Sequence, residues 1–132
     1  MTLARVTTWP ERSLIALGCV AGCLGVALSA AAAHVGSGAT LETSARFLLF
    51  HAPALIGLAA AVAAGLLHPA LGRIAGAALA IGLALFSGDL ALRALRGATL
   101  LTMAAPTGGI VLMAGWALGV AAALVGGSRP PA

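Results

Sequence analysis

The chain is poor in charge. Of its 132 residues 8% are charged, and these comprise seven arginines, three acids and no lysine. A soluble domain carries about 25% charged residues, so this composition excludes an ordinary soluble domain. Intrinsic disorder requires low hydrophobicity, and the hydrophobic share of 61% excludes it as well. An integral membrane protein remains, and the length predicts a single domain over residues 1–132.

Several other features are missing. The net charge of +4 comes from scattered arginines without a basic run or stripe, which excludes nucleic acid as a partner. The only cysteines, Cys19 and Cys23, lie four apart in an apolar run, so we expect packing residues and no metal site. No phosphate-binding loop is present, and no nucleophile lies near a base by sequence. We therefore expect neither an enzyme nor a cofactor.

Long apolar runs make up most of the chain. A membrane-crossing helix needs about 20 mostly apolar residues. Runs without any charged residue cover 13–41, 47–72 and 97–128, and a further apolar run fills most of 74–95. They are continuous and rich in Ala and Leu, which favours helices over the alternating strands of a membrane barrel. We predict an all-α integral membrane four-helix bundle with helices at about 13–34, 44–67, 70–95 and 106–126.

The predicted connections are short, so neighbouring helices should be antiparallel and both termini should lie on one side. We call the end where the first helix begins end A and the opposite end B. End A would hold four arginines and end B three, a narrow bias that places end A in the cytoplasm. We expect a multi-pass protein of the bacterial inner membrane. The arginines of end A are Arg5, Arg12, Arg73 and Arg129, and those of end B are Arg46, Arg93 and Arg96.

Two processing signals are alternative interpretations of the first apolar run. Arg5 and Arg12 precede a stretch that ends in Ala31–Ala33, which resembles a secretory signal with a small-residue cleavage site. Residues 20–23 resemble a lipoprotein box around Cys23. The chain stays apolar after Cys23, whereas a lipoprotein would become polar, so we favour a membrane helix.

Glycine is abundant, with 18 residues, and many recur at intervals of three or four. In lipid, helices associate through close van der Waals contact, which small residues permit. We therefore expect a tight bundle with these glycines at its interfaces: Gly18, Gly22, Gly25, Gly72, Gly76, Gly88, Gly115 and Gly119.

Polar side chains gather near end B. Two acid–arginine pairs have a spacing of four, which places each pair on one helical face. Asp89 would lie about 9 Å inside the third helix, from a rise of ~1.5 Å per residue, and would pair with Arg93 or, across helices, with Arg46. The candidate cluster consists of His34, Glu42, Arg46, His51, Asp89 and Arg93.

Three interpretations of this cluster stay open. The first is structural, with the ion pairs tying the second helix to the third. The second is a transport or proton site, because ionisable residues inside a membrane are functional candidates by default. The third is binding of a haem or a quinone, with His34 or His51 as ligand or hydrogen-bond partner.

Four sequence stretches carry a family resemblance. They are LSAAAAH at 28–34, ETSAR at 42–46 followed by FHA at 50–52, FSGDL at 86–90, and APTGG at 105–109 followed by Gly115-Trp116. In this order they resemble the domain of unknown function 423 family of small membrane proteins, whose animal relatives are called transmembrane protein 256. The resemblance runs from about Leu14 to Gly126. It implies a four-helix membrane protein and no established activity.

The resemblance carries over to His34, Glu42, Arg46, His51, Asp89, Pro106, Gly108, Gly109 and Trp116. The chain departs from the family pattern at Ala31, Phe47 and Phe50, and it has no tyrosine, so it offers no tyrosine hydroxyl for a function. We expect a non-catalytic accessory or structural subunit of a larger membrane complex. Its partners would be lipid and other membrane subunits or copies of itself. The alternative is a self-contained oligomeric transporter or channel.

Overall fold

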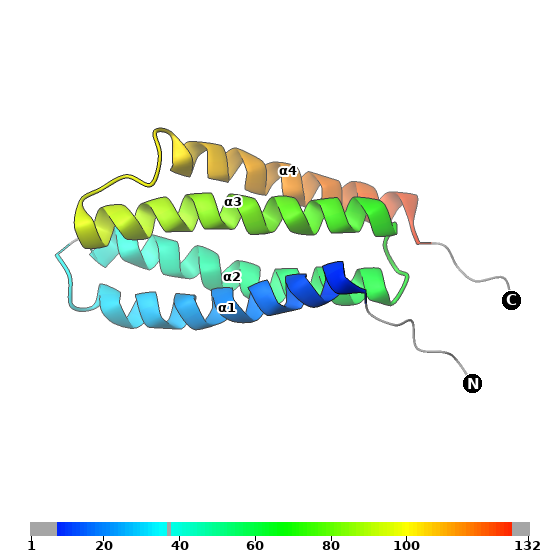
Figure 1. The fold of residues 1–132 in the computed structure, drawn as a ribbon, viewed down its shortest axis with the longest axis horizontal. Helices are drawn as coiled ribbons and strands as arrows, with labels where there is room; N and C mark the ends of the chain where they lie inside the picture. Colours follow the sequence, from blue (N-terminus) through cyan, green and yellow to red (C-terminus); the bar gives the residue numbers. More distant parts are fainter. Residues whose placement is uncertain (1–7, 37, 128–132) are drawn as a thin grey trace, which may run out of the picture.

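The computed structural model describes residues 8–36 and 38–127. They form an all-α bundle with the order α1 (Trp9–Ala32), α2 (Gly38–Ala63), α3 (Pro69–Arg96) and α4 (Ala104–Val125). Each helix is long and apolar enough to cross a membrane. Successive helices run antiparallel, so α1 begins and α4 ends at the same end of the bundle, end A (Figure 1). The predicted fold class is confirmed.

The helix starts differ from those predicted, and local capping explains two of them. α1 begins four residues early because the Thr8 N–H donates to Glu11 Oε2 (3.0 Å) in a capping box, with Pro10 in the first turn. α3 begins at Pro69, where His68 Nδ1 accepts from the Leu71 N–H (3.4 Å).

Two helix ends follow from glycine. α2 ends at Ala63, earlier than predicted, and Gly65 follows with a φ of 74°. α3 ends where Gly97 takes the left-handed conformation at a φ of 65°, and its N–H donates to the Arg93 carbonyl. Glycine adopts this conformation without the steric cost that a side chain imposes.

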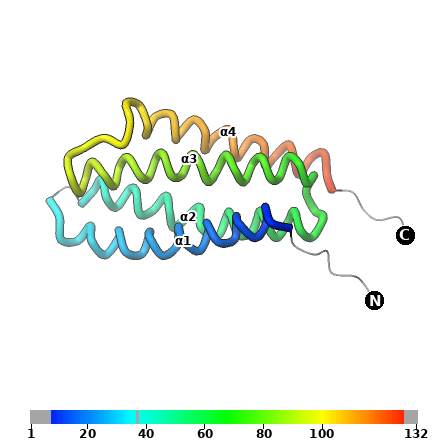
Figure 2. Tube along the Cα trace, viewed as in Figure 1, coloured from blue at the N-terminus to red at the C-terminus, as the bar shows by residue number. Residues whose placement is uncertain are grey.

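The helices pack in chain order. α1 packs on α2, α2 on α3 and α3 on α4, while α1 touches α3 more sparsely. α3 therefore lies between α4 and the α1–α2 pair (Figure 2). The core is formed mainly by leucines that face inward from all four helices: Leu14, Leu48, Leu55, Leu79, Leu83 and Leu112.

Five of the predicted packing glycines lie at helix interfaces. A Cβ added at any of them would come within 3.0 Å of a neighbouring helix, as at Gly18, Gly25, Gly72, Gly76 and Gly115. At Gly22 and Gly88 the nearest atom would lie at an ordinary 3.6 Å. A Cβ at Gly119 would have no atom of another described helix within 4 Å, because Gly119 borders a cleft, so its packing role stays a prediction.

The backbones of α3 and α4 approach each other closely at two glycines that were not predicted from residue spacing. A Cβ at Gly82 of α3 would lie 2.8 Å from the Leu112 nitrogen, and one at Gly108 of α4 would lie 2.6 Å from the Phe86 nitrogen. Because the obstacles are backbone atoms, they can move only if α3 and α4 separate. The two glycines set the distance between these helices.

Candidate functional site

Glu42 lies near the start of α2 at end B. Its Oε1 accepts from Arg46 Nε at 3.2 Å, and its Oε2 accepts from the Ser29 hydroxyl of α1 at 3.2 Å. The ion pair is exposed, with 35% of the Glu42 side chain and 68% of the Arg46 side chain accessible. Glu42 therefore connects α2 to α1 through Ser29.

Asp89 is fully buried in the last third of α3. Its Oδ2 accepts from Arg93 Nε at 2.6 Å, and its Oδ1 accepts from the Leu100 backbone N–H at 2.8 Å. Leu100 belongs to the connection between α3 and α4. The carboxylate thus fastens that connection to α3.

The second and third helices are not tied together by the ion pairs, contrary to the structural interpretation. Each ion pair at end B lies within one helix, because a spacing of four brings the two side chains together on the same face. Arg46 binds Glu42 and not Asp89. α2 and α3 are joined instead by the buried Ser44 hydroxyl, which donates to the Ser87 carbonyl at 2.8 Å.

A second cluster lies at end A, where none was predicted. Glu11 is 2% exposed, and its Oε1 accepts from Arg73 Nε of α3 at 2.8 Å. Its Oε2 accepts from the Thr8 N–H and hydroxyl, and Arg73 Nη2 donates to Thr8 Oγ1 at 3.2 Å. This cluster joins α1 to α3. The capping-box spacing of Thr8 and Glu11 was the available signal, but nothing in the sequence pointed to Arg73.

End A is also closed by the backbone. The His68 N–H donates to the Ala122 carbonyl of α4 at 3.0 Å, which holds the α2–α3 connection against the end of α4. A Cβ at Gly127 would overlap the Gly65 carbonyl oxygen, so the chain after α4 packs tightly on this connection.

The two predicted histidines have different environments. His34 is exposed in the turn after α1. His51 is 7% exposed and lies midway along α2, where its Nδ1 is 2.8 Å from the Phe47 carbonyl. Its Nε2 accepts from Trp116 Nε1–H of α4 at 3.3 Å. A carbonyl only accepts and an indole only donates, so these partners require the neutral Nδ1–H tautomer.

This arrangement weakens the haem interpretation. Iron ligation needs a free lone pair on an imidazole nitrogen, and both ring nitrogens of His51 are bound to protein groups. In the part of the chain that the structure describes, no three His, Cys, Asp or Glu side chains are placed to hold a metal ion.

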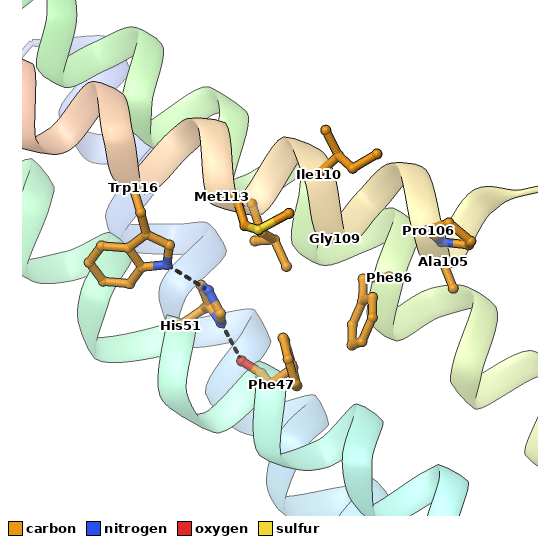
Figure 3. A pocket seen from close by; sticks show the side chains of 10 residues that line it. Phe47, His51, Phe86, Ala105, Pro106, Gly109, Ile110, Met113 and Trp116 are labelled. Carbon is orange, nitrogen blue, oxygen red and sulfur yellow. Dashed lines mark hydrogen bonds between the residues drawn. The ribbon is translucent and has the colours of Figure 1, made fainter.

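A pocket of about 580 Å³ lies beside His51, between α2 and α4 and over α3 (Figure 3). Phe47 and Phe86 contribute rings whose centroids are 4.3 Å apart. Trp116 closes one end, and Pro106 and Met113 line the α4 side (Figure 3). His51, Pro106 and Trp116 are separate candidates in the sequence, and the packing of α2, α3 and α4 brings them together.

The comparisons with known proteins agree with the resemblance stated above. The family described as "Protein of unknown function (DUF423)" matches residues 28–109, more than half of the 132-residue chain. No curated protein and no solved structure matches the chain. The match covers the end-B cluster and His51 but stops before Trp116. With its four membrane-length helices and this match, the chain is a multi-pass membrane protein that belongs to the DUF423 family.

Proposed function

We propose that the protein is a non-catalytic structural or accessory subunit of a larger complex in the bacterial inner membrane. One observation carries this proposal. Each of the three acids of the chain binds an arginine with one oxygen and a second polar group with the other. The charged groups hold segments of the bundle together.

The same observation argues against the transporter alternative. A carboxylate that carries protons or ions through a membrane must exchange partners with its cargo. Asp89, the most buried of the three acids, has both oxygens occupied, one of them by the Leu100 backbone N–H. Releasing Asp89 would therefore detach the connection between α3 and α4.

The outer surface of the helices supports a partner within the membrane. Large apolar side chains are exposed along α1 and α4, among them Val26 at 63%, Met113 at 66% and Leu124 at 82%. Such a surface suits lipid or the helices of other subunits. α1 and α4 each have one main packing partner, so both retain an open side for a neighbour.

We also propose that end A faces the cytoplasm. Arg12 and Arg73 lie at this end, while Arg5 and Arg129 fall outside the described residues. Cytoplasmic loops carry an excess of basic residues, and the count of four against three supports this orientation.

The test is native mass spectrometry of the protein extracted from its own membrane in a mild detergent. Masses that combine the 12.7-kDa chain with larger subunits would support the proposal, and the subunits would define the complex. Masses that correspond only to copies of the chain would contradict it.

A flux assay provides an independent test. The purified chain in liposomes should conduct neither protons nor small ions above the level of empty liposomes. Flux that Asp89→Asn abolishes, with folding retained, would favour the transporter.

A further inference from the structure

We propose that the pocket beside His51 binds a membrane-soluble aromatic alcohol, that is, a phenol or quinol head group on an apolar tail. The hydroxyl of this ligand inserts between Trp116 Nε1 and His51 Nε2. This proposal goes beyond the proposed function and does not depend on membership of a complex.

The size and position of the pocket suit such a ligand. Its volume of about 580 Å³ falls within the ~300–1,000 Å³ typical of small-molecule sites. Its floor lies midway along α2 and near the middle of α4, at the depth of the hydrocarbon core. Tryptophan in membrane proteins concentrates at the interfaces, so an indole N–H at this depth is unusual.

The walls of the pocket favour an aromatic ring. Phe47 and Phe86 are tilted by 39° at 4.3 Å, and the rings of His51 and Trp116 lie 5.9 Å apart. Aromatic rings prefer such offset and tilted neighbours. A second cleft of about 290 Å³, lined by Leu58, Gly119 and Val120, shares Trp116 with the pocket, so it can take an apolar tail that passes the indole.

The polar chemistry selects a hydroxyl. His51 and Trp116 carry the only side-chain nitrogen or oxygen atoms among the residues that line the pocket. Their bond of 3.3 Å is longer than the ~2.9–3.0 Å typical of N–H donors. A hydroxyl both accepts and donates, so it accepts from the indole N–H and donates to His51 Nε2. One long hydrogen bond is replaced by two when the exposed Trp116 indole shifts and the two nitrogens, 3.3 Å apart without ligand, separate to about 5 Å.

Other occupants form fewer hydrogen bonds with His51 and Trp116. A carbonyl or an ether accepts from Trp116 but leaves His51 Nε2 buried without a donor, which is unfavourable. An acyl chain fills the space and ignores the pair. The backbone N–H and C=O groups of a neighbouring helix are already hydrogen-bonded within that helix. Its backbone therefore offers no group that could both accept from Trp116 and donate to His51. The site therefore discriminates a hydroxyl from its methyl ether.

The chain provides its own reporter for the test. It has two tryptophans, and Trp9 is 77% exposed at the start of α1, so Trp9→Phe leaves Trp116 as the single fluorophore. This variant in phosphatidylcholine nanodiscs is titrated with para-octylphenol, para-octylanisole and octylbenzene. We expect saturable binding of the phenol, roughly 3- to 10-fold tighter than of the ether, which corresponds to one hydrogen bond.

Two variants assign the effect to the pocket. His51→Leu in the same background removes the acceptor, so the phenol and the ether should bind equally. Gly109→Leu places a side chain in the pocket, where a Cβ meets only Phe86 at 3.9 Å, and should abolish binding. The matched control is Gly57→Leu, on the exposed face of α2 with no described atom within 4 Å of its Cβ, and it should bind as the parent does.

Three outcomes in which a probe binds would overturn the proposal. They are equal affinities for the phenol and its ether in the Trp9→Phe protein, equal affinity for octylbenzene, and binding that a folded Gly109→Leu protein retains. Equal affinity for octylbenzene would assign the pocket to a hydrocarbon chain. Absence of saturable binding of all three probes would also contradict the proposal and leave the pocket to a partner helix.

Discussion

The two ends of the bundle use the same chemistry for different connections. At end A the Glu11–Arg73 pair links α1 to α3, and the Glu11 side chain is 3% exposed. At end B each ion pair stays within its helix, and the second oxygen of each acid reaches another segment, at Ser29 or at Leu100. What an acid contributes therefore depends less on its arginine than on the burial and the position of its second partner.

Asp89→Ala should have the largest effect, because it removes the interactions that hold the α3–α4 connection on α3 at end B. Removing one partner of a buried ion pair costs about 3–5 kcal/mol, and we expect about 3 because Arg93 is 43% exposed and can turn toward water. The free energy of unfolding in bicelles, from a denaturing-detergent titration, provides the measurement. Asp89→Asn keeps an acceptor for the Leu100 N–H and should lose about half as much. Parental stability of Asp89→Ala would refute the fastening role.

Glu11→Ala tests the connection at end A. We expect a loss of about 2 kcal/mol, less than for Asp89, because Arg73 lies at the end of the bundle with 40% of its side chain exposed. The double-mutant cycle with Arg73→Ala should show a coupling energy of about 1 kcal/mol. Either substitution alone already removes the Glu11–Arg73 interaction, so the second substitution costs less in the presence of the first. Additive losses would mean that the two side chains stabilise α1 and α3 separately.

Adjacent glycines at the start of α4 provide a comparison that involves no charge. Gly108→Ala should cost about 1–3 kcal/mol, because its Cβ would meet the Phe86 nitrogen at 2.6 Å and force α3 and α4 apart. Gly109→Ala meets only Phe86 Cδ2 at 3.9 Å and should stay within about 0.5 kcal/mol of the parent. Thermal unfolding of both variants measures the difference. Equal losses would show that backbone proximity does not hold these helices together.

The sequence predicted the fold well because bilayer thickness determines how long an apolar run must be. The start of α1 was missed because Glu11 and Arg12 are charged, although the helix begins before them. Gly82 and Gly108 were missed because α3 packs on both α2 and α4. Small residues of α3 lie on both of its packing faces, whereas the predicted ridge, with a spacing of four, describes only one face.

The candidate site was predictable only where partners are close in sequence. A spacing of four identified Asp89–Arg93 and Glu42–Arg46 on their helices. Partners from other segments, such as Arg73 for Glu11 or Trp116 for His51, depend on helix packing that local spacing does not encode.

Arg46→Ala should have the smallest effect. The Glu42–Arg46 pair is exposed and i,i+4, so we expect a loss of about 0.3–0.5 kcal/mol that disappears in high salt. Ser29→Ala, which removes the hydrogen bond between α1 and α2, should cost about 1 kcal/mol at any salt concentration. Unfolding titrations at low and high ionic strength separate the two contributions. If Arg46→Ala costs as much as Glu11→Ala, burial cannot explain why the two ends differ.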